Sequence, residues 1–179
     1  MTLVVLHGAE SVGKTNLGRE LAAAYGALFL PEFGRTWCEI FGTDCSVADL
    51  IEIGENQQRN IEHALTDRDF VISDTDSLMT AAWAKMMLGE NPPALLAARK
   101  ADLYLHCHAD VPFVDDGLRV FGDDAERQKF DALSRQVLAD AGVNVVEISG
   151  DWHNRRVKAV AAIDALLRPL GFDSAQSAG

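Results

Sequence analysis

Residues 2–15 read Thr-Leu-Val-Val-Leu-His-Gly-Ala-Glu-Ser-Val-Gly-Lys-Thr, and this stretch decides the fold. Residues 2–6 are a short apolar run, which is typical of a buried central strand. Residues 8–15 match G-x-x-x-x-G-K-[ST], the glycine-rich P-loop whose backbone amides point toward phosphate groups. Apolar side chains then recur at helical spacing up to Gly26, which supplies a C-terminal stop. The stretch therefore predicts a strand, a P-loop and a helix that together bind a nucleoside triphosphate with magnesium.

Individual P-loop residues have expected roles. Lys14 reaches the β- and γ-phosphates, and the Thr15 hydroxyl is a ligand for magnesium. The helix that begins near Lys14 adds the positive end of its dipole. An accidental glycine turn is the alternative, and the strand and helix around the motif argue against it. The residues expected to hold the triphosphate are Gly8, Ala9, Glu10, Ser11, Val12, Gly13, Lys14 and Thr15.

Strand and helix patterns alternate along the rest of the chain. Further strands are predicted at residues 27–30, 69–73, 101–107 and 143–148, and helices at residues 14–25, 32–41, 46–66, 78–88, 124–140 and 153–168. Such alternation specifies parallel strands joined by crossover helices, with ligands at the carboxyl ends of the strands. We predict a three-layer α/β fold of the P-loop NTPase type, in which a five-stranded, mainly parallel sheet has helices on both faces and a small lid. Residues 1–172 are expected to form a single domain, and residues 173–179 a flexible tail.

The composition is that of a folded globular protein. Of the 179 residues 48% are apolar and 24% are charged, and the net charge is −11. This acidity argues against a nucleic-acid surface, because phosphate backbones bind clustered Lys and Arg. No 18-residue apolar stretch or basic leader is present, so we expect a cytoplasmic protein without a membrane partner. Cys38, Cys45 and Cys107 lack zinc-site spacing and are expected to be reduced core thiols. The oligomeric state is left open.

Acidic residues follow two of the predicted strands. Asp74 ends the strand at residues 69–73, which is where a P-loop protein places its acid for the metal. Asp76 is a substrate-side candidate, and a helix N-cap is the alternative. Glu32 follows the second strand and could accept a proton from a hydroxyl, while Arg35 could neutralise phosphoryl charge. Surface positions in the first turn of a helix are the alternative for Glu32 and Arg35.

The charged segment at residues 110–127 is expected to form a lid. Its first part, residues 110–119, reads Asp-Val-Pro-Phe-Val-Asp-Asp-Gly-Leu-Arg. Arg119 and Arg127 would touch the transferring phosphoryl group while the closed lid excludes water. The alternative is that both arginines merely offset the charge of the neighbouring acids, Asp115, Asp116, Asp123 and Asp124.

Aromatic and histidine residues near these positions have two interpretations. Trp37 and Trp83 lie on predicted helices beside the acidic positions, so either could stack on an aromatic substrate ring. Core packing is the alternative for both. His7, His106 and His108 share no metal-ligand spacing, so we expect structural roles and no zinc site.

Four segments together resemble the nicotinamide riboside kinase domain of NadR-type proteins. They are the P-loop, Pro-Glu-Phe-Gly-Arg at residues 31–35, Asp-Thr-Asp at residues 74–76 and the segment at residues 110–119. The P-loop is generic, but its combination with the other segments and with Gln57-Gln58 is specific to this group. The resemblance spans nearly the whole chain. It implies ATP-dependent phosphorylation of the 5′-hydroxyl of nicotinamide riboside, which gives nicotinamide mononucleotide for NAD salvage.

The resemblance also implies roles for individual residues. The P-loop would hold ATP and Mg²⁺, with Thr15 and Asp74 at the metal. The catalytic residues would be Lys14, Glu32, Asp76, Arg119 and Arg127, with either Glu32 or Asp76 at the riboside hydroxyl. The acceptor-binding residues would be Glu32, Arg35, Trp37, Gln57, Asp74, Asp76, Trp83 and Asp116.

One departure from the resemblance concerns domain content. NadR-type proteins commonly carry an upstream nucleotidyltransferase domain with an H-x-G-H motif, which this sequence lacks. We therefore expect the chain to make the mononucleotide and a separate adenylyltransferase to complete NAD. Two alternatives stay open: a kinase for another nucleoside or small metabolite, or a domain that senses or hydrolyses ATP.

Overall fold

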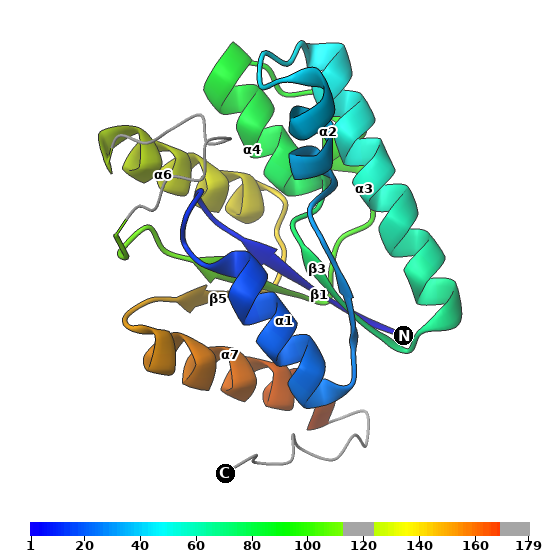
Figure 1. Cartoon of the computed structure of the whole chain (residues 1–179), viewed down its shortest axis with the longest axis vertical. Coiled ribbons are helices and arrows are strands. Elements are labelled where there is room, and N and C mark those ends of the chain that lie inside the picture. Colours follow the sequence, from blue (N-terminus) through cyan, green and yellow to red (C-terminus); the bar gives the residue numbers. More distant parts are fainter. Residues whose placement is uncertain (113–123, 169–179) are drawn as a thin grey trace.

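The computed structural model describes residues 1–112 and 124–168 (Figure 1). Its strands are β1 (Thr2–His7), β2 (Leu28–Leu30), β3 (Phe70–Asp74), β4 (Leu103–Cys107) and β5 (Val145–Ile148). Its helices are α1 (Lys14–Tyr25), α2 (Phe33–Phe41), α3 (Val47–Asp67), α4 (Ser77–Leu88), α5 (Pro93–Ala97), α6 (Asp124–Asp140) and α7 (Trp152–Leu167). Each strand and helix predicted from the sequence is present in the described residues. The short helix α5 was not predicted, although it begins at Pro93 and proline is favoured at the first position of a helix.

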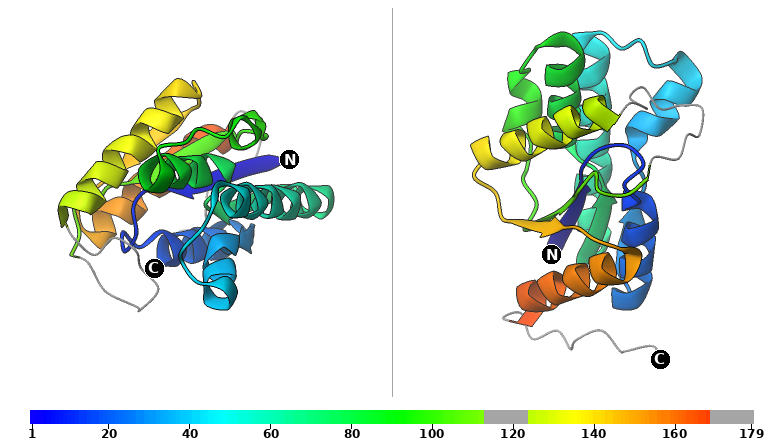
Figure 2. Two further views of the ribbon diagram at one scale, coloured as in Figure 1. Left: turned by 90° about the horizontal axis from the view of Figure 1, so that it is seen from above. Right: turned by 90° about the vertical axis from the view of Figure 1, so that its left-hand side faces the viewer.

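The five strands form one sheet in the order β2-β3-β1-β4-β5, and each neighbouring pair is parallel. Helices α1 and α7 cover one face, and α3, α4 and α6 cover the other (Figures 1 and 2). This arrangement confirms the predicted three-layer P-loop fold. Because β1 lies at the centre, the P-loop that follows it has β3 and β2 on one side and β4 and β5 on the other.

The register of the sheet brings the carboxyl ends of three strands together. Leu6 of β1 pairs with Asp74 of β3, and His7 pairs with His106 of β4. All residues of β1, β3 and β4 are buried, as expected for central strands covered by helices on both faces. The strand ends are therefore rigid supports for the loops that follow them.

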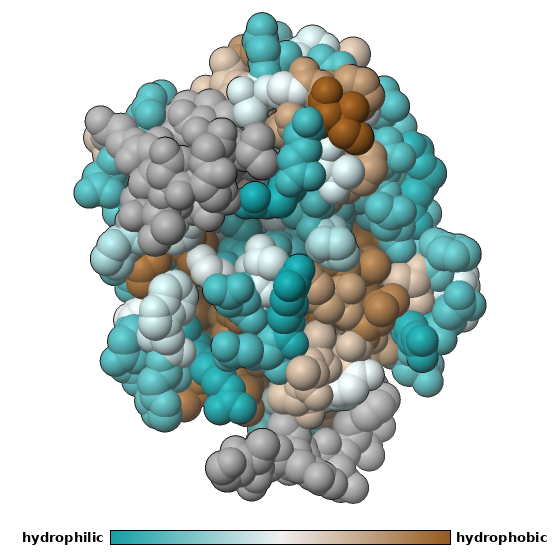
Figure 3. All heavy atoms as spheres, viewed as in Figure 1, coloured by the Kyte–Doolittle hydropathy of each residue, from teal (hydrophilic) through white to brown (hydrophobic). Residues whose placement is uncertain are grey.

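Helix α2 packs on a small core of its own above the strand ends. Its Phe33 and Trp37 contact a cluster of buried residues contributed by the segment before α3, by α3 and by α4: Cys45, Leu50, Ile53 and Ala84. Ile40 and Phe41, farther along α2, are exposed, and Figure 3 shows apolar surface over this helix. Helix α2 is thus held at its first turns, next to Glu32.

In the described ranges, none of the helices combines the length and the apolar character that a membrane span needs. Most of the predicted lid lies in residues 113–123, and the predicted tail lies in residues 173–179. Both of these ranges are outside the described residues. The lid, the tail and the single-domain boundary at residue 172 stay predictions.

Candidate active site

The P-loop backbone adopts conformations that require its glycines. Gly8 has φ +130°, and a Cβ placed on it would lie 2.2 Å from the carbonyl oxygen of Cys107 in β4. Gly13 has φ +81° and is the N-cap of α1, and Ser11 is a non-glycine residue with φ 59°. Residues in such conformations persist only where the surrounding structure holds them. The motif therefore forms a curved loop seated on β4 and at the start of α1.

The side chain of Lys14 lies across this loop. Its Nζ donates hydrogen bonds to the carbonyl oxygens of Gly8 at 3.0 Å and Ala9 at 2.8 Å. At Gly13, the N-cap of α1, there is no side-chain cap, so the first amides of α1 are available to an anion. The loop thus combines a fixed ammonium group with uncapped helix amides, which is the arrangement that binds phosphate.

Asp74 and Thr15 meet beside the loop because β3 pairs with β1. The Thr15 hydroxyl donates a hydrogen bond to Oδ2 of Asp74, whose side chain is 1% exposed. Oδ1 of Asp74 is also buried, and within residues 1–112 and 124–168 it has no hydrogen-bond partner. A buried carboxylate oxygen without a donor is costly unless a ligand satisfies it. One hydroxyl and one free carboxylate oxygen match the oxygen ligands that Mg²⁺ prefers.

Glu32 lies at the end of β2 and is the N-cap residue of α2, although its side chain makes no capping hydrogen bond. Burial, reinforced by the negative charge of Asp74, raises the pKa of Glu32 to about 7. Lys14 and Arg35 oppose this rise. A carboxyl group with a pKa near neutrality in a cleft is suited to accept a proton.

Many of the predicted donor and acceptor residues line one cavity of about 460 Å³. One end is formed by the P-loop and the first turns of α1. The other end is formed by α2, α3 and α4. Of the predicted site residues, those that line it are Glu10, Ser11, Val12, Gly13, Lys14, Thr15, Glu32, Arg35, Gln57 and Trp83. The triphosphate loop and the candidate base therefore share a cavity large enough for a small molecule.

Gln57 connects three elements at the wall of this cavity. Its Nε2 donates to Oγ of Ser73 at 2.9 Å and to the carbonyl oxygen of Pro31 at 3.4 Å. Its Oε1 accepts a hydrogen bond from the backbone amide of Phe33 at 2.8 Å. Since Pro31 and Phe33 flank Glu32, the amide of Gln57 fixes the turn that carries the candidate base.

Asp76 supports the helix-cap alternative. Its Oδ1 accepts hydrogen bonds from the backbone amides of Leu78 at 3.0 Å and Met79 at 3.3 Å. Its Oδ2 accepts one from the Tyr104 hydroxyl at 2.6 Å. In the described part of the chain, Asp76 is not among the residues that line the cavity. Both carboxylate oxygens of Asp76 thus accept hydrogen bonds that cap α4 and anchor Tyr104, and a contact of Asp76 with an acceptor hydroxyl stays a prediction.

Trp37 and Trp83 occupy different environments. Trp83 lines the cavity, and its ring lies against Phe130 of α6 with 4.2 Å between ring centroids. Trp37 packs between Phe33 and Phe41, with centroids 6.4 Å and 4.7 Å away. Trp37 is absent from the described lining of the cavity, which corresponds to the core-packing alternative. Of these two tryptophans, Trp83 is the one that lines the cavity in the described ranges.

The predicted lid contacts are only partly described. Arg127 is buried at the start of α6, where it pairs with Asp124 at 3.1 Å and donates to the carbonyl oxygen of Val111 at 3.1 Å. It is absent from the cavity lining that the described residues provide, so a phosphoryl contact from Arg127 stays a prediction. Arg119 and Asp116 lie outside the described residues.

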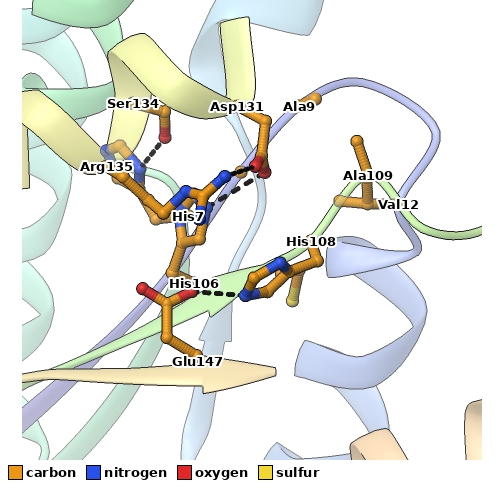
Figure 4. Close-up of polar contacts among 12 residues, drawn as sticks. His7, Ala9, Val12, His106, His108, Ala109, Asp131, Ser134, Arg135 and Glu147 are labelled. Carbon is orange, nitrogen blue, oxygen red and sulfur yellow. Dashed lines mark hydrogen bonds and ion pairs between the residues drawn. The ribbon is translucent and has the colours of Figure 1, made fainter. Parts of the chain in front are cut away.

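His7, His106 and His108 form a row of three neighbouring rings on the face covered by α6 (Figure 4). His7 Nδ1 is 2.7 Å from Oγ of Ser134, His106 Nε2 is 3.1 Å from Oδ1 of Asp131, and His108 Nε2 is 2.6 Å from Oε2 of Glu147. Burial, with the nearby charges of His106 and Lys14, holds the pKa of His7 well below its usual range.

No group of three or more metal-ligating side chains occurs in residues 1–112 and 124–168. The three cysteines have free thiols; Cys45 and Cys107 are buried, and Cys38 is half-buried. Cys38 and Cys45 also line the cavity, which the sequence analysis did not anticipate. Burial raises the pKa of the Cys38 thiol to about 11, so this thiol stays protonated at neutral pH.

Known proteins share this fold and sequence pattern. A family model described as an AAA domain matches residues 3–155. The "Trifunctional NAD biosynthesis/regulator protein NadR" of Salmonella typhimurium is 26% identical over 177 residues, which are 94% of this chain and 43% of that protein. The chain therefore spans less than half the length of this relative.

Two solved structures of NadR proteins are also similar. NadR in complex with NR superposes with a TM-score of 0.75 at 23% identity, covering 98% of this chain and 52% of that one. NadR in complex with NAD and AMP-PNP gives a TM-score of 0.71 at 23% identity, covering 98% and 51%. At this level of identity the structures establish the shared fold.

Proposed function

The chain belongs to the AAA domain family, and we propose that it is an ATP-dependent kinase of nicotinamide riboside, whose product is nicotinamide mononucleotide. The single observation that carries the proposal is that Glu32, with a pKa of about 7, lines the same cavity as Lys14 and Thr15. A phosphoryl donor site and a candidate base for a hydroxyl acceptor thus share one space. The acceptor's identity is supported by the NadR relatives, one of which has been solved in complex with NR.

The donor half would be formed by the P-loop. Its backbone amides and Lys14 would hold the β- and γ-phosphates of ATP, where negative charge develops during transfer. The Thr15 hydroxyl and the free Oδ1 of Asp74 would hold Mg²⁺, which supplies charge neutralisation at those phosphates. The buried oxygen of Asp74 supports this assignment, because it has no donor within the described ranges.

The acceptor half would be formed by α2, α3 and α4. Glu32 would accept the proton of the 5′-hydroxyl as that oxygen attacks the γ-phosphorus, the bond from this phosphorus to the β–γ bridging oxygen breaks and ADP leaves. Gln57 would hold the turn that carries Glu32. Trp83, supported on one side by Phe130, would contact the nicotinamide ring. Arg35 would add positive charge to the cavity wall near Glu32.

The test is a substrate panel with purified protein. The protein is incubated with ATP, Mg²⁺ and nicotinamide riboside, uridine, adenosine or thymidine, and products are separated by chromatography and identified by mass. Nicotinamide mononucleotide is expected, and Lys14→Ala is expected to abolish it because the phosphate contacts are lost. Consumption of another nucleoside without nicotinamide mononucleotide would overturn the acceptor. ATP hydrolysis that no nucleoside stimulates would instead favour a sensing or hydrolysing domain.

A further inference from the structure

An exposed tryptophan lies directly against the P-loop, outside the acceptor cavity. Trp152 is the first residue of α7 and is 59% exposed. A Cβ placed on Gly13 would lie 2.5 Å from Cζ3 and 2.7 Å from Cη2 of Trp152, so the edge of the indole covers this glycine. Trp152 is therefore fixed along one edge while much of its ring surface stays exposed beside the loop.

Arg155 holds this tryptophan and the loop together. Its guanidinium carbon lies 5.5 Å from the centroid of the Trp152 ring, and the side chain is 1% exposed. It donates to the carbonyl oxygens of Val12 at 3.1 Å and Gly150 at 2.8 Å. The indole is therefore supported by a fixed cation and by the loop, so little conformational entropy would be lost when a ligand stacks on it.

The order of the strands determines which end of the triphosphate faces Trp152. Asp74 ends β3 and Glu32 follows β2, so the terminal phosphates and the acceptor lie on that side of the loop. The nucleoside end must then leave the loop on the opposite side, toward β4 and β5. Helix α7 follows β5 and lies beside α1 (Figure 2), and its first residue, Trp152, lies against Gly13 of the P-loop.

From this arrangement we infer that Trp152 is the platform on which the base of the donor nucleotide stacks. Every base has an aromatic face that can stack on indole, and a purine offers the largest one. The positive charge of Arg155 on the indole further fixes the ring in place. The inference rests on the proposed nucleotide binding and adds the residue that recognises the base, while the P-loop recognises the phosphates.

The first test compares two ligands that share phosphates and differ in the base. ADP and inorganic tripolyphosphate are titrated by calorimetry into the wild type, Trp152→Ala and the control Val157→Ala, an exposed position on the same helix. Trp152→Ala is expected to raise the Kd for ADP by about tenfold, as loss of one stacking platform does, and to leave the Kd for tripolyphosphate unchanged. Equal weakening of both ligands would mean that Trp152 acts through the loop. An unchanged Kd for ADP in Trp152→Ala would also overturn the inference.

A second readout keeps the inference testable if Trp152→Ala does not fold. Stacking of a base on indole quenches its fluorescence, and Trp152→Phe keeps an aromatic platform while removing this indole. ADP is expected to quench the wild type, and the quench is expected to disappear in Trp152→Phe, although Trp37 and Trp83 remain. A quench that persists in Trp152→Phe, or no quench in the wild type, contradicts the inference. Both tests measure binding of ADP without nicotinamide riboside, so their outcome does not depend on whether the protein phosphorylates the riboside.

Discussion

Glu32 is the residue on which the proposed chemistry depends. The carboxylate would have to accept a proton from the attacking hydroxyl, and a pKa of about 7 makes it both ionisable and basic at neutral pH. Glu32→Gln keeps the shape of the side chain and removes this function. We expect kcat to fall on the order of 10²-fold or more while the Kd for ATP stays within about threefold. Steady-state kinetics and calorimetric titration with ATP measure the two quantities.

The stability of Glu32→Gln separates a chemical loss from a folding defect. Burial raises the pKa of Glu32 from 4.5 to about 7, so the folded state binds this proton more tightly than the unfolded chain. Ionisation of Glu32 therefore lowers stability as the pH rises through this interval. Glutamine does not ionise, so the Tm of the variant at pH 8 should be no lower than that of the wild type. A large fall in Tm at pH 8 would contradict this placement of Glu32.

The pH dependence of turnover is a further prediction for Glu32. Protonated Glu32 cannot accept a proton, so kcat should rise with pH, with a midpoint near 7, and reach a plateau above it. The profile is measured between pH 5.5 and 9 with saturating ATP, magnesium and riboside. The Glu32→Gln profile should lack this rise. An identical rise in the variant would assign the titration to another group.

At the scale of the element, Asp76 joins the start of α4 to β4. Asp76→Ala removes the N-cap of α4 and leaves the buried Tyr104 hydroxyl without its acceptor. We expect a loss of about 2 kcal/mol in the free energy of unfolding, which combines a lost cap with an unsatisfied buried group. Urea unfolding measures it. If Asp76→Ala instead keeps the stability of the wild type and its kcat falls as much as that of Glu32→Gln, Asp76 would be the base.

Helix α7 is joined to the P-loop by Arg155. Its guanidinium donates hydrogen bonds to the backbone carbonyl oxygens of Val12, His108 and Gly150, and it forms an ion pair with Asp110. Lysine keeps the charge but cannot reproduce this planar set of donors. Arg155→Lys should therefore lower the Tm and weaken tripolyphosphate binding, because the loop loses its support.

The adjacent substitution Arg156→Lys is the matched control, since Arg156 is exposed on the same helix. It should change neither the Tm nor the Kd for tripolyphosphate. If the two variants behave alike in thermal unfolding and calorimetry, the link from Arg155 to the P-loop contributes nothing measurable.

At the scale of the whole molecule, the fold was predictable because local pattern and topology agree. The apolar strands and the P-loop fix a parallel sheet, and the sequence places Asp74 and Glu32 at its carboxyl edge. The sequence left Asp76 open between a helix cap and a substrate-side role, since the Tyr104 hydroxyl that occupies its second carboxylate oxygen lies 28 residues away on β4. Likewise, Trp83 lines the cavity against Phe130 of α6 whereas Trp37 packs against Phe33 and Phe41, and this difference depends on how the helices pack.

Other site features had no signal in the sequence. Trp152 and Arg155 stand in no recognised motif, and their contact with the P-loop depends on how α7 packs beside α1. Helix α5 similarly depends on close packing against α3. Its Leu95 lies so near Gly54 of α3 that a Cβ placed on Gly54 would be 2.2 Å from the Leu95 side chain. The sequence pattern allows several roles and local conformations for these residues, and packing between elements far apart in the chain determines which one is adopted.

The central claim is that the P-loop and the Glu32 side of the cavity form two halves of one phosphoryl-transfer site. It is tested most directly by the stoichiometry of the reaction, in which ADP and nicotinamide mononucleotide are measured together by mass spectrometry with and without nicotinamide riboside. The account predicts one mononucleotide for each ADP, and ADP formation that depends on the riboside. ADP formed at the same rate without the riboside, or without matching mononucleotide, would contradict it.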